Sequence, residues 1–194
     1  MARSRTESKA DRRDQIMAAA LRLFSKQGYA ATPVPLIAGE LGVAVGGLYR
    51  YFPSKELLAN AVYQRAMKLC SEFLLSEFRA SSSIQERFHH LWQRMHKFAV
   101  EYSDEFVFLE LHNHDTYLNK KSLSADAELT AVLDAYIKEG QKAGEIRKME
   151  PALAISIVLH VYLAYFRSST GGEIKNLHAG LAQAERAAWL AIST

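Results

Sequence analysis

Helical periodicity constrains this chain more than any other feature of its sequence. Apolar residues recur at spacings of three and four along the 194 residues, which is the pattern of amphipathic helices packed on a common core. No run of strict apolar and polar alternation bounded by turn residues indicates a β-sheet. We therefore predict an all-α fold of about nine helices, three at the N-terminal end and six behind them.

Turn signals divide the N-terminal end into three helices. The first is expected over residues about 9–27. Thr32 is then expected to cap a helix whose first position is Pro33, where a missing N–H costs nothing. A second short helix follows over residues about 44–51. These two helices and the turn between them form a compact unit at residues 33–52.

The chain is expected to divide near the start of its longest helix. Ser54 is the predicted N-cap of that helix, which runs for about 25 residues. Residues 1–53 are therefore assigned to an N-terminal three-helix domain, and residues 54–194 to a second helical domain.

Charge is unevenly distributed between the two ends. Residues 1–55 carry nine Lys and Arg against four acids, whereas residues 56–194 carry fifteen against seventeen. A basic end is typical of proteins that bind a polyanion such as a nucleic acid, but basic arms are also common as solvated tails.

Other features of the composition argue against several classes of protein. No apolar run approaches the roughly 20 residues of a membrane span, and the basic, polar N-terminus is unlike a secretory signal. The single Cys70 excludes an internal disulfide and fits a reducing compartment. We expect a cytoplasmic protein with no membrane partner.

Residues 33–52 have the spacing of a helix-turn-helix, whose second helix enters the major groove of DNA. Leu48 and Phe52 are four apart and should point inward. Tyr49 and Tyr51 are then left to point outward, where their hydroxyls can donate to phosphate oxygens. The alternative is that these aromatic residues belong to the core.

A longer run of motifs surrounds this unit. It contains a Gly-aromatic pair, an Ile-Ala pair, a Gly-Val turn, Leu-Tyr-x-Tyr-Phe and Ser-Lys-x-x-Leu. Residues 12–58 read RRDQIMAAALRLFSKQGYAATPVPLIAGELGVAVGGLYRYFPSKELL. This segment resembles the N-terminal domain of TetR/AcrR-family transcriptional repressors. The resemblance implies a homodimer that binds a palindromic operator in double-stranded DNA and is released by a small-molecule effector in the C-terminal domain.

The same resemblance assigns roles to the two domains and to single residues. Residues 1–53 become an arm and a DNA-binding domain with its reading unit at 33–52, and residues 54–194 a domain for effector binding and dimerisation. Thr32 would cap the first reading helix and touch a phosphate. Residues 45–47 at the start of the second helix would face base edges. Tyr49, Tyr51 and Lys55 would contact phosphates. The implied DNA contacts are Thr32, Val45, Gly46, Gly47, Tyr49, Arg50, Tyr51 and Lys55.

Two departures from the family pattern affect the reading unit: Pro33 and Pro35 stiffen its first helix, and its second helix lacks the usual cap. Ala44 replaces the usual Ser cap, at a cost of about 1 kcal/mol. The pair Gly46 and Gly47 either brings the backbone close to DNA or is merely tolerated, and both interpretations stay open. Because bidentate base reading needs Arg, Lys, Asn or Gln, specificity would rest on Val45, Arg50, DNA shape and a basic arm. That arm consists of Arg3, Arg5, Lys9, Arg12 and Arg13.

Two C-terminal segments are candidates for a dimer interface. Residues 151–166 are apolar around the whole helix, which requires protein on every face. The last helix also offers apolar residues at helical spacing, and the family resemblance places the interface in the same region. We expect a homodimer through helices at about 151–167 and 177–193. The alternative is a monomer whose core buries the first of these helices.

Aromatic and polar residues that interrupt apolar stretches are candidates for an effector cavity, although most of the apolar ones would serve equally as core. The apolar candidates are Phe88, Trp92, Met95, Phe106, Phe108 and Tyr165, and the polar candidates are Glu110, His112, His114 and His160. No metal site or cofactor is assigned, because histidines two apart cannot share a helix face. A zinc site assembled from distant histidines stays an alternative.

These observations support three functions in order. The first is a ligand-responsive repressor of transcription. The second is a helical interaction protein with a degenerate helix-turn-helix that lacks sequence-specific reading, as Ala44 and the glycine pair suggest. The third is an α-helical enzyme, but no catalytic triad, phosphate-binding glycine loop or carboxylate pair has the required spacing. We expect no enzymatic activity.

Overall fold

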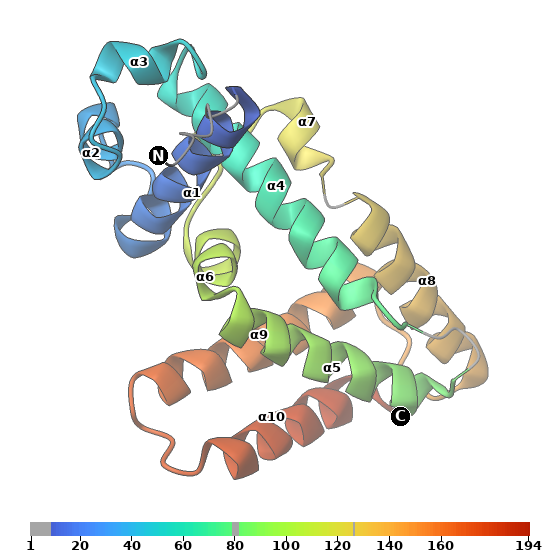
Figure 1. Cartoon of the computed structure of the whole chain (residues 1–194). Coiled ribbons are helices and arrows are strands. Elements are labelled where there is room, and N and C mark those ends of the chain that lie inside the picture. Colours follow the sequence, from blue (N-terminus) through green and yellow to red (C-terminus); the bar gives the residue numbers. More distant parts are fainter. Residues whose placement is uncertain (1–8, 79–81, 126) are drawn as a thin grey trace, which may run out of the picture. The chain divides into compact units, whose positions relative to one another are not determined.

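The computed structural model describes residues 9–78, 82–125 and 127–194, which are almost entirely helical (Figure 1). This part of the chain contains ten helices, where about nine were expected, and no strand, which confirms the all-α fold. A single antiparallel bridge joins Ile146 and Ser193. The helices are α1 (Lys9–Gln27), α2 (Val34–Glu40), α3 (Val45–Tyr49), α4 (Lys55–Leu75), α5 (Ile84–Glu101), α6 (Ser103–Leu111), α7 (Lys120–Leu123), α8 (Ala127–Ala143), α9 (Pro151–Thr170) and α10 (Leu177–Ile192).

Backbone contacts group the chain into two compact units. The first comprises residues 1–73 and 96–126, and the second comprises residues 74–95 and 127–194. This grouping reflects contacts rather than roles, so the functional division expected at residue 54 stays a prediction.

The core of the first unit is built on α1. Ile16, Ala20 and Phe24 are at most 1% exposed, as the apolar face of this helix predicted. The Phe24 ring stacks on Phe108 of α6 with centroids 5.9 Å apart. α1 ends at Gly28, whose φ of +81° is the left-handed conformation that glycine adopts most easily. The first helix is therefore fixed to α6 through its buried face.

α2 and α3 form the expected pair of short helices. Leu48 and Phe52 are buried, as predicted, and so is Ile37 of α2. Gly42 makes the turn between the helices with a φ of +65°. The opposite face of α3 is consequently free to meet a partner.

Thr32 does not cap α2, contrary to the prediction. Pro33 occupies the N-cap position with an extended backbone, and no side chain bonds to the start of the helix. The Thr32 side chain is fully buried, and its hydroxyl donates to the Gly28 carbonyl at 2.7 Å. The hydroxyl thus bonds to a carbonyl at the end of α1 rather than to an N–H at the start of α2. Because the side chain is buried, it has no access to a phosphate.

Ser54 caps α4, as predicted, because its Oγ accepts a hydrogen bond from the Leu57 N–H at 3.1 Å. On the buried face of α4, Asn60 lies among apolar neighbours and is 2% exposed. A buried amide must find hydrogen-bond partners, and those of Asn60 come largely from the segment after α6.

Aromatic rings fill the second unit. Trp92 of α5 is 1% exposed, stacks on Phe88 at 6.1 Å and meets Tyr162 of α9 edge-on at 5.4 Å. The Tyr136 hydroxyl of α8 donates to the Ile84 carbonyl at 2.9 Å. These rings tie the first half of α5 to α8 and α9.

α9 corrects one expectation from the sequence. By length and composition, α9 is long and apolar enough to cross a membrane. No apolar run was expected to approach the length of a membrane span. In the most apolar part of this helix, just 22% of the residues are buried, and Leu153 is 53% exposed. The folded chain therefore leaves uncovered much of a helix that was expected to have protein on every face.

Candidate nucleic-acid interface and ligand groove

α3 presents small residues to solvent. Gly46 is exposed and Val45 and Gly47 are half-buried, while Leu48 anchors the helix in the core. A Cβ added at either glycine would meet no heavy atom within 4 Å, and neither glycine has a positive φ. The folded chain therefore has no internal need for glycine at these two positions.

The glycines lower the stability of a helix that is already weak. α3 has five residues and begins at Ala44 without a side-chain cap, as the missing Ser predicted. Glycine in a helix interior is less favourable than alanine by about 1 kcal/mol. This cost has no compensation in internal packing, so a benefit, if there is one, must come from outside the chain.

Groups that can donate to phosphates lie beside α3. Tyr49 is 43% exposed, Arg50 is exposed, and Tyr51 is half-buried. The Lys55 ammonium lies 4.1 Å from the centroid of the Tyr29 ring, and partial burial lowers the pKa of Lys55. Hydroxyl, guanidinium and ammonium donors therefore occur together on one short stretch of chain.

The basic arm is described in part. Arg3 and Arg5 lie outside the described residues. Lys9 is exposed at the start of α1, whereas the Arg13 guanidinium lies over the Phe52 ring at 4.6 Å from its centroid. Arg13 therefore packs on the core of the helix-turn-helix through its contact with Phe52.

The candidates for an effector site fall in both compact units. Each unit holds its own group of them. The first unit contains Phe106, Phe108, Glu110, His112 and His114, and the second contains Phe88, Trp92, Met95, His160 and Tyr165.

In the first unit, the candidate histidines are held by local contacts. His112 Nε2 donates to the Ser25 carbonyl of α1 at 2.7 Å. His114 Nδ1 makes a short hydrogen bond with the Tyr117 hydroxyl, and burial lowers the pKa of His114. Phe108 is fully buried in the core. The contact of His112 connects the segment after α6 to α1.

In the second unit, most candidates are core or surface residues. His160 is exposed, and its Nδ1 donates to the Ser156 carbonyl of its own helix at 2.7 Å. The Tyr165 hydroxyl donates to the Leu177 carbonyl at 3.1 Å. Phe88 differs from these two residues, because it lines a groove.

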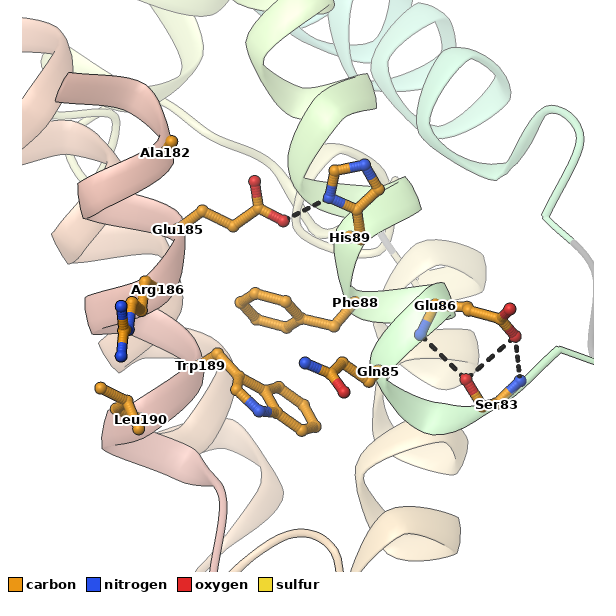
Figure 2. A pocket seen from close by; sticks show the side chains of 10 residues that line it. All are labelled: Ser83, Gln85, Glu86, Phe88, His89, Ala182, Glu185, Arg186, Trp189 and Leu190. Atoms are coloured by element: carbon orange, nitrogen blue, oxygen red, sulfur yellow. Dashed lines mark hydrogen bonds and ion pairs between the residues drawn. The ribbon is translucent and has the colours of Figure 1, made fainter. Parts of the chain in front are cut away.

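The groove lies between α5 and α10 and has a volume of about 560 Å³, within the usual range for small-molecule sites. Figure 2 shows Phe88 reaching from α5 toward Trp189 of α10; their ring centroids are 5.1 Å apart. Gln85, Arg186 and Leu190 also line it. An aromatic wall with polar residues at its edge suits a compact, partly apolar ligand.

Hydrogen bonds fix the edges of this groove (Figure 2). Glu185 of α10 accepts from Gln93 at 3.0 Å and lies 2.5 Å from His89 Nδ1 of α5. At the start of α5, Ser83 and Glu86 bond reciprocally as a capping box, and these bonds lower the pKa of Glu86. Hydrogen bonds therefore hold the groove-lining residues of α5 and α10 in place.

Sequence reasoning found one lining residue of the groove, Phe88, and missed the rest. Trp189 offered a signal, since it is the only Phe, Tyr or Trp in an alanine-rich helix. Its partners on α5 lie about a hundred residues earlier, which periodicity within one helix cannot reveal.

Among residues 9–78, 82–125 and 127–194, no group of three or more His, Cys, Asp or Glu side chains is placed to hold a metal ion.

Comparison with protein families matches almost the whole chain. Residues 16–62 match the model for bacterial regulatory proteins of the tetR family. Residues 63–194 match the model for the tetracyclin repressor-like C-terminal domain.

Curated relatives agree with this assignment. The chain is 23% identical over 160 residues to an uncharacterised HTH-type transcriptional regulator, YhgD, of Bacillus subtilis, covering 79% of this chain and 82% of that one. It is 51% identical over 53 residues to the HTH-type transcriptional repressor KstR of Rhodococcus jostii, covering 27% of this chain and 25% of KstR. The higher identity is thus confined to a short segment.

Solved structures share the fold. A TetR-family transcription regulator from Marinobacter aquaeolei has a TM-score of 0.81 at 20% identity, covering 93% of this chain and 95% of that one. AibR, solved in complex with isovaleryl coenzyme A and operator DNA, has a TM-score of 0.67 at 25% identity, covering 78% of this chain and 85% of AibR.

Proposed function

The chain belongs to the tetR family of bacterial regulatory proteins, and from this premise we propose that it is a repressor that binds a palindromic operator as a homodimer and is released by a small-molecule effector. As a member of this family it is a DNA-binding transcriptional regulator and not an enzyme. We place it in the cytoplasm, where chromosomal DNA is its partner.

The observation that carries the proposal is the open surface at Gly46 and Gly47. Without a Cβ at either position, the start of α3 can approach the floor of the major groove closely. Val45 then meets a thymine methyl, and the exposed Arg50 is available to a base edge. Tyr49, Tyr51 and Lys55 donate to phosphates on either side. Thr32 is left out of this set because it is buried.

The uncovered surface of α9 supports a homodimer. An exposed apolar helix is stabilised when a second copy covers it, and Leu153 of α9 is 53% exposed. Two copies also supply the two reading helices that a palindrome requires, about 34 Å apart for half-sites one turn apart.

We assign effector binding to the groove between α5 and α10. It offers enough volume for a small molecule, together with a preformed aromatic wall. AibR binds isovaleryl coenzyme A, so coenzyme A thioesters are the first ligands to test. Effector binding would favour a conformation whose reading helices no longer fit the operator.

One observation favours a second function. α3 lacks its side-chain cap and carries two glycines, so the chain could be a helical interaction protein whose helix-turn-helix no longer reads sequence. Binding to DNA without any sequence preference would distinguish this function from the first.

A genomic selection tests the proposal. Purified protein is incubated with sheared DNA from its source organism at about 0.15 M salt, and the bound fragments are sequenced. Enrichment of one short palindrome supports a sequence-specific repressor. Uniform recovery of all fragments contradicts it and favours the interaction protein.

A further inference from the structure

The segment that follows α6, residues 112–122, is fastened to the DNA-binding end of the chain. At its start, His112 donates to the Ser25 carbonyl of α1. The Ser25 hydroxyl in turn donates to Asp104 of α6 at 2.7 Å. These contacts hold the segment in a defined position.

Asn60 of α4 uses its full hydrogen-bonding capacity, and three of its four bonds reach this segment. Its amide nitrogen donates to the carbonyls of Glu56 at 2.9 Å and Tyr117 at 2.7 Å. Its amide oxygen accepts from the Asn119 N–H at 2.8 Å and the Ser122 hydroxyl at 2.6 Å. Because Asn60 is buried, releasing the segment would leave several polar groups without partners. The segment is therefore latched to the first half of α4.

The latch places the ring of Tyr117 on Tyr29. The two rings stack with centroids 4.1 Å apart, and Tyr117 is 4% exposed. The Lys55 ammonium also lies 4.1 Å from the Tyr29 centroid. Two groups that close to one centroid cannot share a face of the ring, so Tyr117 and Lys55 lie on opposite faces. Lysine, tyrosine and tyrosine form a continuous column.

A second contact fixes the Tyr117 end of the column. The Tyr117 hydroxyl bonds to His114 Nδ1, while His114 Nε2 faces the Leu109 carbonyl of α6 at 3.3 Å. A carbonyl can only accept, so the proton lies on Nε2 and Nδ1 accepts from the tyrosine. Through His114, the Tyr117 end of the column is connected to the last turn of α6.

We propose that Tyr117 is a positioning residue for DNA binding, which acts through Tyr29 to hold the Lys55 ammonium where it meets a phosphate. This inference rests on the proposed phosphate contact of Lys55. The ring of Tyr29 attracts the ammonium and leaves N–H donors on its outer side free. Tyr117 backs the ring and prevents it from tilting away. A shift of residues 112–122 would then weaken DNA binding without moving α3.

The salt dependence of DNA binding tests this inference. Each phosphate contact adds about 0.9 to the slope of log affinity against log salt, independently of sequence, so a duplex of about 30 base pairs of arbitrary sequence serves as the probe. We expect Lys55→Ala and Tyr117→Ala each to reduce the slope by up to about 1. The double variant should bind no more weakly than Lys55→Ala alone, because both changes remove one contact.

Two further variants separate positioning from general damage. Tyr117→Phe keeps the ring and should retain the wild-type slope. Tyr102→Ala removes the same atoms from another aromatic stack of the same unit, on Phe98 and Phe73, and should also leave the slope unchanged. A fraction of misfolded protein scales every affinity equally and does not change a slope, so partial unfolding cannot imitate the expected result.

Four results would overturn the inference, and three of them concern Tyr117. They are an unchanged slope in Tyr117→Ala, additive losses in the double variant, and tighter binding by Tyr117→Ala, which would mean that the column withholds Lys55 from DNA. An unchanged slope in Lys55→Ala would overturn it as well. Failure of the wild-type protein to bind duplex DNA at low salt would instead refute the proposed function itself.

Discussion

The reading surface of α3 and the groove between α5 and α10 are two binding surfaces of opposite construction. α3 carries two glycines at which an added Cβ would meet no other atom of the fold within 4 Å, and its neighbouring donors lie on one short stretch of chain. The groove is walled by Phe88 and Trp189, and its edge carries the paired Glu185 and His89. The first surface is open and carries few side chains, whereas the second is a groove whose edge groups already bond to one another.

This difference matches the partners proposed for the two surfaces. DNA is a large, rigid polyanion, so a surface that binds it needs close approach and uncommitted donors. A small molecule must be surrounded, and a preformed aromatic wall provides contact area without a large ordering cost. The two surfaces should therefore respond to mutation in different ways.

The largest expected effect comes from removing phosphate donors beside α3. Changing both Tyr49 and Lys55 to alanine should weaken DNA binding about 100-fold, roughly 1.4 kcal/mol for each lost donor. The loss should be similar for all sequences, because phosphate contacts carry no sequence information. Fluorescence anisotropy with a labelled duplex measures it.

A matched control for this double variant is Lys26→Ala with Tyr102→Ala, which removes the same two residue types from other parts of the first unit. Equal losses in the two double variants would show that DNA binding does not depend on this surface.

The next effect concerns the exposed surface of α9. Leu153→Glu should weaken self-association at least about tenfold, because a buried unpaired carboxylate is costly at an apolar interface. Sedimentation velocity over a range of concentrations measures the change. Leu123→Glu, at an exposed leucine of α7, is the control and should leave self-association intact. If both variants associate like the wild type, α9 does not form the dimer interface.

A smaller effect is expected from filling the groove. Ala182→Phe should reduce binding of a coenzyme A thioester about tenfold and change the stability by no more than about 0.5 kcal/mol, since Ala182 is exposed on the groove wall. Both tryptophans of the chain lie at or behind the groove, so intrinsic fluorescence follows occupancy, with isovaleryl coenzyme A as the first probe.

Ala187→Phe is the control for this variant, because Ala187 is also exposed on α10 but does not line the groove. It adds the same ring to the same helix and should leave binding of the thioester unchanged. A ligand that quenches the fluorescence equally in both variants binds elsewhere.

The smallest effect is a pH dependence of stability. Burial lowers the pKa of His114 in the folded chain, so below its ordinary value of about 6.5 the unfolded chain binds more protons. The free energy of unfolding should therefore decrease as the pH falls through about 6.5. His114→Gln should reduce this decrease, whereas His178→Gln, at an exposed residue of α10, should not. Urea denaturation at several pH values makes the comparison, and identical curves for wild type and His114→Gln would contradict it.

The DNA-binding end could be predicted well because its signals are local. Leu48 and Phe52 are four residues apart and both are buried, and Ser54 caps the helix that it precedes. The prediction that Thr32 caps α2 was wrong, because its hydroxyl can bond either to the start of α2 or to the end of α1 and bonds to the Gly28 carbonyl. Pro33 occupies the N-cap position instead. Local patterns thus fixed the helices and failed at a choice between competing hydrogen bonds.

The groove between α5 and α10 and the latch could not be predicted, because their partners are distant in sequence. Asn60 and Tyr117 are 57 residues apart and His89 and Glu185 are 96 apart, so periodicity along one helix carries no information about them. Phe106 and Phe108 were candidates for lining a cavity, but both are buried in the core. An apolar sequence pattern predicts burial and does not distinguish residues that fill the core from residues that line a cavity.

The central claim, that the glycines of α3 serve close approach to DNA, is tested most directly by Gly46→Ala with Gly47→Ala. Two alanines should raise the free energy of unfolding by about 1–2 kcal/mol, because their Cβ atoms meet nothing in the fold. The same variant should bind its operator about tenfold more weakly than the wild type. Higher stability with unchanged DNA affinity would contradict the claim and show that the glycines are merely tolerated.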